Sequence, residues 1–377
     1  MIQMGVMHTI SSLLITFVLL LVLYALLRGI LLQSPANYST QSTIGNNYSS
    51  THQASTQQST LPPSTTQKAT TTIARVTTQQ YSGGNATVEY ALGLINRDRN
   101  NYALHNVTLS SEPSAQQHAN SMLANSYFSH WDTHGMKPYM RYTLLGGRGS
   151  VTENIAFVYN SSGINITSTL KEMEYNFMYN DYKCCQNGHR DNILNPWHNQ
   201  VSIGIAYNET AIYFVEDFID SYIAWLGGTP SVSDNLNVTL LGSLPNGYSL
   251  SSIQINYDVP VSNLTQADFN MSPYNGPYSY GTTVAGIGYT SGNEYFYFGN
   301  ITTINATAYD INGTTFNVAF GLKKLEAQDG PGEYTIMMLL DNGTAQACAA
   351  GACSPFVGAT YTIFVDPAGM PYIPSQV

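Results

Sequence analysis

The chain has 377 residues and a formal net charge of −10 at pH 7, and only 10% of its residues are charged, against about 25% in an ordinary soluble domain. This argues against nucleic acid as a partner, because phosphate binding depends on clustered Lys and Arg, and the sequence has no basic patch. Since Tyr occurs 28 times, hydroxyl and amide groups must solvate much of the surface.

The first predicted element is a transmembrane helix. Residues 10–27 carry no formal charge, and as a helix they reach about 27 Å, enough to cross the hydrocarbon core of a bilayer. A secretory signal has a basic start and small residues at its cleavage point, whereas Gln33-Ser34-Pro35-Ala36 is a poor cleavage site. We therefore expect residues 1–33 to be a retained anchor, with a cleaved signal as the alternative. The nearest basic residue, Arg28, follows the helix, and basic residues beside a membrane helix favour the cytoplasmic side. Arg28 therefore does not support an extracellular position for the bulk of the chain.

A polar stalk is expected after the anchor. Residues 34–84 are almost wholly Ser, Thr, Gln, Asn and Pro, a composition that predicts disorder and suits O-glycosylation. N-glycosylation acceptors of the form Asn-x-Ser/Thr recur at Asn37, Asn47, Asn85, Asn106, Asn160, Asn165, Asn208, Asn237, Asn263, Asn300, Asn305, Asn312 and Asn342. Their density predicts a single-pass glycoprotein of the cell membrane, with the bulk of the chain extracellular.

The four cysteines are an even count, as expected of an exported protein. Cys348 and Cys353 flank a four-residue stretch and are close enough in sequence to form a disulfide across a small loop. Cys184 and Cys185 are adjacent, and either a vicinal disulfide or two thiols fits the sequence. A zinc finger is excluded, because no second pair with ligand spacing lies nearby.

Residues 85–226 are predicted to form an α+β domain. Apolar side chains recur on one face of three helices, namely Val88, Leu92 and Ile95; Ala115, Ala119, Met122 and Leu123; and Leu170, Met173 and Phe177. Ser111-Glu112-Pro113 marks the start of the second helix, with a serine cap and an early proline. Two strands, residues 202–207 and 213–218, are joined as a hairpin.

The pattern changes to alternation from residue 227 to residue 377. Apolar residues recur at every second position around 253–257, 316–320, 334–340 and 361–365, which predicts strands with one buried face. Asn-Gly turn signals separate them, and no helical stretch is expected between them. We predict an antiparallel β-sandwich of immunoglobulin-like size.

Three motifs in the first domain carry polar side chains that a single site could combine. They are Tyr127-Phe128-Ser129-His130, Glu153-Asn154-Ile155-Ala156 and residues 188–194, which begin Gly-His-Arg-Asp. The sequences of these motifs and their order along the chain resemble the CAP superfamily of cysteine-rich secretory proteins, antigen 5 and pathogenesis-related 1 proteins. The resemblance covers roughly residues 88–220 and implies an α-β-α sandwich.

In that family two histidines and two acidic residues line a cleft. The resemblance places the histidines at His130 and His189 and the first acid at Glu153. Two neutral imidazoles and a carboxylate suit an open site for Zn²⁺ or another divalent cation, so these three residues are the candidate metal ligands. The structural alternative is that His130 fixes the loop before Trp131 and that His189 caps the following helix.

The second acid of the cleft is ambiguous. Family members usually place it a few residues after a Trp, on the helix before the last motif. This chain has Phe177 in that place, which leaves Asn180 at the acid position and Asp181 beside it. We prefer Asp181, and Glu174, one helical turn further back, is the alternative.

Two functions compete for this sequence. The first is a membrane-tethered binding module whose cleft engages a lipid, sterol, glycan or protein, as the anchor, stalk and acceptor sites suggest. The second is a metal-assisted hydrolase of extracellular peptides or cell-envelope polymers, which rests on His130, Glu153 and His189 alone. We favour the first, a protein that is not an enzyme, with the membrane and an extracellular ligand as its partners.

Overall fold

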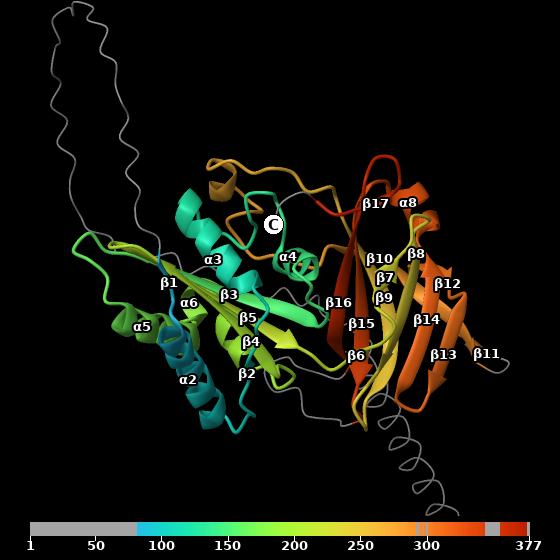
Figure 1. Cartoon of the computed structure of the whole chain (residues 1–377), viewed down its shortest axis with the longest axis horizontal. Helices are drawn as coiled ribbons and strands as arrows, with labels where there is room; N and C mark the ends of the chain where they lie inside the picture. The colour runs from blue at the N-terminus through green and yellow to red at the C-terminus, as the bar shows by residue number, and fades with distance from the viewer. Residues whose placement is uncertain (1–80, 292–293, 297, 299–300, 344–354, 375–377) are drawn as a thin grey trace, which may run out of the picture. The chain divides into compact units, whose positions relative to one another are not determined.

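The computed structural model describes residues 81–291, 294–296, 298, 301–343 and 355–374 (Figure 1). The predicted anchor of residues 1–33, the stalk up to residue 80, and both Cys348 and Cys353 lie outside the described residues. Within the described ranges, no helix is long and apolar enough to cross a membrane.

An N-terminal sheet organises the first half of the described chain. Its strands run in the order β1-β4-β5-β3, and β2 also pairs with β4. They are β1 (Tyr81–Ser82), β2 (Thr108–Leu109), β3 (Ser150–Tyr159), β4 (Gln200–Tyr207) and β5 (Ala211–Asp220). The predicted hairpin is confirmed as β4 and β5. The predicted end of the stalk at residue 84 is wrong, because the backbone of β1 pairs with the edge of β4.

Helices cover both faces of this sheet. They are α2 (Asn85–Asn101), α3 (Ser114–Asn125), α4 (Pro138–Leu144), α5 (Ile166–Tyr179), α6 (Tyr182–Cys185) and α7 (Gly188–Ile193). α2 and α5 share one apolar cluster with β4 and β5, whereas α3 packs against the opposite face. Gly204 permits that approach, because a Cβ there would lie 2.0 Å from the carbonyl oxygen of Ala115. The α+β prediction and its three helices are confirmed.

The start of α3 differs from the prediction in one respect. Pro113 occupies the position before the helix, and no side chain caps it, so Ser111 is not the capping residue. Instead, the Glu112 carboxylate accepts the backbone N–H of Ser114, which satisfies one of the unpaired donors of the first turn.

Two further sheets form the C-terminal half of the described chain. One has the order β11-β10-β9-β15-β16-β17, with β12 on β10, and the other has the order β13-β14-β8-β6, with β7 on β8. The strands are β6 (Ala224–Trp225), β7 (Ser231–Val232), β8 (Asn237–Ser243), β9 (Ser249–Asp258), β10 (Thr282–Ser291), β11 (Glu294–Phe296), β12 (Thr302–Asn305), β13 (Ala308–Asn312), β14 (Thr315–Gly321), β15 (Gly332–Asp341), β16 (Phe356–Val365) and β17 (Pro371–Tyr372). Both sheets contribute to one apolar core, as expected of a β-sandwich.

Three details of the sandwich depart from the prediction. β6 lies before residue 227 but pairs with β8, so the sandwich begins earlier than expected. β10 and β12 are parallel. The helix α8 (Lys323–Asp329) interrupts the strands, as does a short 3-10 helix, Asp268–Asn270. α8 connects β14 to β15, which belong to different sheets, and its Leu325 is buried in their common core.

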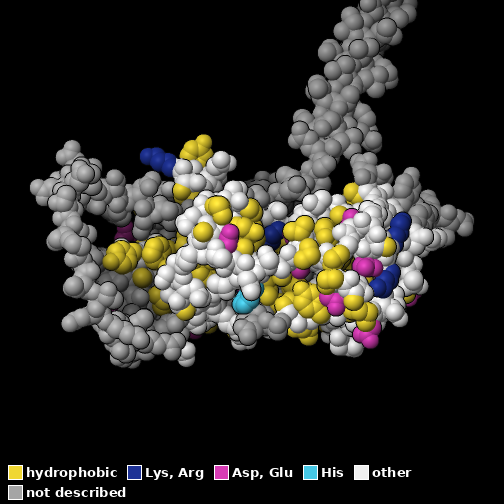
Figure 2. Space-filling model, turned by 90° about the horizontal axis from the view of Figure 1, so that it is seen from above, with side chains coloured by type: hydrophobic (Ala, Val, Ile, Leu, Met, Phe, Trp, Pro, Cys, Tyr) yellow, Lys and Arg dark blue, Asp and Glu magenta, His cyan; other side chains and the backbone are white. Residues whose placement is uncertain are grey.

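All described residues lie within one compact unit. The N-terminal and C-terminal halves of the described chain share a further apolar cluster. Trp131, Tyr139 and Val151 from the first half pack there with Tyr278 and Phe364 from the second. Charged side chains are few and scattered on the face seen in Figure 2, in line with their 10% share of the sequence.

Candidate functional site

His130 lies in the loop after α3, and its imidazole is held by a carboxylate. Its Nδ1 is 2.8 Å from Oε1 of Glu153 on β3. The other oxygen of Glu153 accepts a hydrogen bond of 2.7 Å from Arg141 on α4, whose guanidinium also donates to the carbonyl oxygen of His130. All three side chains are buried. The first two motifs therefore meet, and Arg141 joins them.

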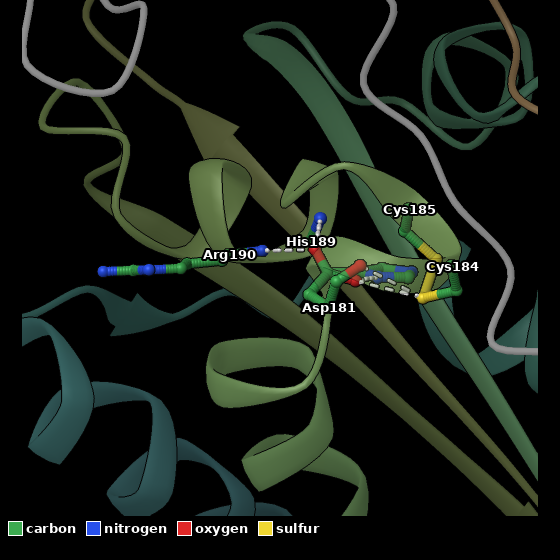
Figure 3. Close-up of a disulfide and its surroundings, with 5 residues drawn as sticks. All are labelled: Asp181, Cys184, Cys185, His189 and Arg190. Atoms are coloured by element: carbon green, nitrogen blue, oxygen red, sulfur yellow. Dashed lines mark hydrogen bonds and ion pairs between the residues drawn. A yellow bond between two sulfur atoms is a disulfide. The ribbon is translucent and has the colours of Figure 1, made fainter.

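His189, the second residue of α7, is held by a carboxylate in the same way. Its Nδ1 is 2.6 Å from Oδ1 of Asp181, and its backbone N–H donates to Oδ2 of the same residue. The N–H of Arg190 also points to Oδ2, at 3.3 Å. Asp181 is thus the acid that contacts the second histidine (Figure 3).

The outer nitrogen of each of these two histidines is buried without a hydrogen-bond partner among the described residues. Since a carboxylate only accepts, each Nδ1 carries the proton, and each Nε2 presents a lone pair. His198 is different, because its Nδ1 contacts Asp220 and its Nε2 contacts Asn192. His198 therefore has the contacts of a structural histidine, whereas His130 and His189 do not.

The electrostatics of the site keep both imidazoles neutral. Burial, with a smaller effect of Arg141, lowers the pKa of His130 to about 3. Burial also lowers the pKa of His189, and although its hydrogen bond to Asp181 opposes this effect, the charge of His130 adds to it.

Buried carboxyl groups extend from Glu153 across the sheet. Asp217 lies opposite Glu153 in the pairing of β3 with β5. The hydroxyl of Ser114 is hydrogen-bonded to Asp217 and to Glu112. Burial raises the pKa of Glu153 and of Glu112 to about 7, and it raises that of Asp217 well above its ordinary value. This face of the sheet can therefore hold protons near neutral pH.

Glu174, the alternative second acid, lies in a different environment. It is buried on α5, and burial followed by the charge of Glu216 raises its pKa well above its ordinary value. Glu216 on β5 accepts a hydrogen bond of 3.1 Å from Asn154. Glu174 thus belongs to a carboxyl pair within the core.

The predicted cleft is closed. His130, Glu153 and His189 are each 0% exposed. Residues 259–281, which connect β9 to β10 and which we call the covering segment, contribute Tyr278. Its hydroxyl accepts the backbone N–H of Glu153, and its ring centroid is 5.0 Å from that of His130. No local sequence pattern predicts this closure, because Tyr278 lies 125 residues after Glu153.

Further contacts fasten the covering segment to the loop around His130. The Ser129 hydroxyl donates to the carbonyl oxygen of Tyr274, at 2.6 Å, and the rings of Tyr127 and Phe269 stack at 4.2 Å. A surface pocket of about 270 Å³ lies elsewhere, and it is lined by Leu123, Ser126, Phe157, Tyr159, Asn208, Thr210, Ala211 and Tyr213.

Cys184 and Cys185 form a vicinal disulfide beside Asp181 (Figure 3). Among the described side chains, those of Asp181, Cys185 and His189 are near enough to share a metal ion, with one ligand atom from each within 4.8 Å of the others. His130 and Glu153 are not part of this group. The predicted trio of His130, Glu153 and His189 does not form such a group among the described residues.

Arg141, Asp217 and the covering segment were missed in the sequence. A signal existed for the first two, because Arg141 is a lone charge among aromatic and apolar residues and Asp217 interrupts an apolar strand. Charges in such positions are costly unless they are paired.

Most of the predicted glycosylation acceptors are accessible. Exposed asparagines are Asn85, Asn106, Asn160, Asn165, Asn237, Asn263, Asn305 and Asn312, and half-buried ones are Asn208 and Asn342. Asn37, Asn47 and Asn300 lie outside the described residues. One acceptor was overlooked, the exposed Asn270 of Asn270-Met271-Ser272.

Comparisons with known proteins bear on the first half of the chain. Residues 92–218 match the model of the Cysteine-rich secretory protein family, CAP, which confirms the resemblance seen in the three motifs. An extracellular protein containing a SCP domain from Bacillus anthracis str. Ames is 23% identical, with a TM-score of 0.29, over 36% of this chain and 41% of that one. An outer surface protein from Borrelia burgdorferi is 12% identical, with a TM-score of 0.28, over 37% of this chain and 99% of that one. The chain thus spans less than half the length of the Bacillus anthracis protein. The comparison with curated proteins gave no match.

Proposed function

Since the chain carries a CAP domain at residues 92–218, we propose that it is an extracellular, membrane-tethered protein whose CAP domain binds a divalent metal ion through His130 and His189. The anchor is residues 1–33, and an extracellular lipid, glycan or protein is the expected partner of the assembled site. The protein acts by binding, and turnover of a substrate is the second candidate.

The observation that carries this proposal is the pair of buried, unpartnered Nε2 atoms of His130 and His189. In metal sites, a carboxylate or carbonyl that accepts the N–H of one ring nitrogen fixes the tautomer and leaves the other nitrogen for the metal. Glu153 and Asp181 stand in that position. A bare ion also suits a closed site, whereas a larger ligand would first require Tyr278 to move.

The residues that would hold the ion have defined tasks. His130 and His189 supply neutral nitrogen atoms, Glu153 and Asp181 orient the two rings, and Arg141 fixes the Glu153 carboxylate. A bound zinc ion supplies Lewis acidity and lowers the pKa of a coordinated water molecule.

One observation favours the hydrolase as a second candidate. Burial raises the pKa of Glu153 to about 7, which suits a group that exchanges protons near neutral pH. If the protein hydrolyses peptides or envelope polymers, Glu153→Gln should abolish turnover even at zinc concentrations that saturate its weakened site. Zinc binding without turnover of either substrate class would exclude this candidate.

Removal of either histidine is expected to abolish most zinc binding. His130→Ala and His189→Ala should each weaken zinc binding by more than about 100-fold, because each removes a nitrogen atom that would coordinate the ion. Asp181→Asn should weaken it by about 10- to 100-fold through loss of ring orientation, and Glu174→Gln should leave it unchanged. Isothermal titration calorimetry at pH 7.5 measures all four affinities.

His105→Ala is the matched control, because His105 is exposed and lies outside the site. Its zinc affinity should equal that of the wild type. An absence of zinc binding in the wild type, or an unchanged affinity of His189→Ala, would contradict the proposal. Far-ultraviolet circular dichroism distinguishes a lost site from a lost fold.

The proposed membrane anchor predicts in which cell fraction the protein is found. Full-length protein should sediment with membranes, and protease added to intact cells should release a soluble fragment by cutting residues 34–80. A glycan at the exposed Asn237 would independently place the β-sandwich outside. Recovery of a soluble protein that begins near residue 37 would instead show a cleaved signal peptide.

A further inference from the structure

We propose that Asp181, Cys185 and His189 form a second metal site, for a zinc-like ion, that becomes available when the Cys184–Cys185 disulfide is reduced. The site uses a thiolate and does not involve His130. It goes beyond the proposed function, and only its consequence for the Nε2 site, described below, rests on that function.

Geometry places the three ligand groups together. The nearest ligand atoms of all three residues lie within 4.8 Å of one another, and Oδ1 of Asp181 is 2.6 Å from Nδ1 of His189. Ligand atoms around tetrahedral zinc are about 3.5 Å apart, as follows from bond lengths of about 2.0–2.3 Å. The most widely spaced pair therefore needs to approach by up to roughly 1 Å, and Asp181 and His189, now 2.6 Å apart, need to separate by about 1 Å as the ion replaces the proton held between them.

The chemistry of the three groups selects the ion. A thiolate, an imidazole and a carboxylate are all zinc ligands, and hard cations such as Mg²⁺ and Ca²⁺ prefer sites made of oxygen atoms alone. All three side chains are buried, so the ion would be shielded from solvent. Three protein ligands leave a fourth coordination position for water or another small ligand.

The disulfide controls access to the thiolate. In the oxidised chain, the sulfur of Cys185 is bonded to Cys184 and carries no negative charge for a metal. Cys184 is exposed, so a dithiol reductant can reach its sulfur from solvent. Attack there forms a mixed disulfide with Cys184 and releases Cys185 as a thiolate.

The second step completes the exchange. The other sulfur of the dithiol attacks the mixed disulfide and leaves as part of the oxidised, cyclic reductant, so two electrons pass to the protein. One of the two reductant protons stays on Cys184, and the other goes to solvent, because Cys185 remains a thiolate on the metal.

Metal binding at this site changes which ring nitrogen of His189 carries the proton. At present Nδ1 of His189 donates to Asp181, and its Nε2 is an acceptor. With the ion on Nδ1, the proton must reside on Nε2, which then becomes a donor and no longer a metal ligand. If the Nε2 site of the proposed function exists, reduction in the presence of zinc would therefore switch it off.

Cobalt(II) is the probe for the test, because a thiolate ligand gives it a sulfur-to-metal charge-transfer absorption. Full-length protein is reduced with dithiothreitol, freed of reductant under nitrogen and titrated with cobalt chloride. The reduced wild type should develop the absorption with about one equivalent of cobalt, and the oxidised wild type should not. Zinc should then displace the cobalt.

Two cysteine variants form a matched pair. Cys184→Ser leaves Cys185 permanently unbonded to a second sulfur, so the absorption should appear without reduction. Cys185→Ser retains the exposed Cys184 thiol, yet it should show no absorption under either condition. The proposal is overturned if reduced wild type and Cys184→Ser both lack the absorption, or if Cys185→Ser retains it.

His130→Ala separates this proposal from the preceding one. That variant should lose the Nε2 site but keep the cobalt absorption after reduction. Loss of zinc binding by the oxidised variant tests only the proposed function. Loss of the cobalt absorption in the reduced variant overturns the thiolate site.

Discussion

Replacing Glu174 with Gln is expected to have almost no effect on stability at pH 4.5 and to stabilise the protein at pH 8, by about 1.4 kcal/mol for each pH unit by which the pKa of Glu174 is raised. Glu174 and Glu216 are both buried, and burial raises the pKa of Glu216 to about 7 and that of Glu174 well above 4.5. The unfolded chain gives up both protons near pH 4.5, whereas the native protein retains them to higher pH. Unfolding is therefore favoured by about 1.4 kcal/mol per pH unit for each such group.

The sign follows from which state binds the proton. A carboxyl group whose pKa is raised in the native state contributes fully below its unfolded pKa, and this contribution is lost as the pH rises through the native value. The amide of Gln has no proton to lose, so its advantage over Glu174 grows with pH above 4.5. Urea unfolding at several pH values measures this slope.

Glu172→Gln is the matched control, because Glu172 is exposed on the same helix, α5. Its effect on the free energy of unfolding should stay within about 0.5 kcal/mol at every pH. A destabilisation by Glu174→Gln that is the same at pH 4.5 and pH 8 would show that Glu174 is ionised in the native protein.

The wild type should accordingly lose stability as the pH rises from about 4.5 to about 8. Buried groups with a raised pKa are Glu112, Glu153, Glu174, Glu216, Asp217 and Glu333. Burial lowers the pKa of His118, His130 and His189, and this contributes the opposite slope, with stability lost as the pH falls below about 6.5. The carboxyl groups outnumber these histidines, so their slope dominates.

Replacing Arg141 with Met is expected to destabilise the protein by about 3–5 kcal/mol. The side chain is buried and donates to Glu153, to the carbonyl oxygen of His130 at 2.7 Å and to that of Met136 at 2.8 Å. Its loss leaves Glu153 without its cationic partner in the core, and removing one member of a buried ion pair costs about this much. Urea unfolding at pH 8, above the pKa of about 7 of Glu153, measures the loss.

A second substitution tests the cause. In Arg141→Met combined with Glu153→Gln, no carboxylate is left unpaired, so the double variant should be more stable than Arg141→Met alone. Arg190→Met is the control, because that guanidinium donates to the hydroxyl of the exposed Tyr102, and its effect should stay below about 1 kcal/mol. Additive effects of the Arg141 and Glu153 substitutions would contradict the ion-pair explanation.

The second acid of the site shows where sequence reasoning stopped. If the helix that contains Glu174 continued through residue 181, either acid could point toward the site. The spacing in the sequence alone therefore cannot show which of the two contacts His189. In the structure α5 ends at Tyr179, and residues 186 and 187 adopt left-handed backbone conformations that reverse the chain before α7. This reversal returns His189 to Asp181.

The sequence by itself determined the α+β class, the positions of α2, α3 and α5 and most long strands of the sandwich, and it predicted His130, Glu153 and His189 as site residues. These features depend on periodicity or on motifs of a few adjacent residues, which are local. The tertiary structure alone decided that Asp181 contacts His189, that Arg141 neutralises Glu153, and that Tyr278 closes the site. Each of these contacts joins different elements of the fold, and Tyr278 meets Glu153 across 125 residues, so its position depends on how the sheets pack and not on any local pattern.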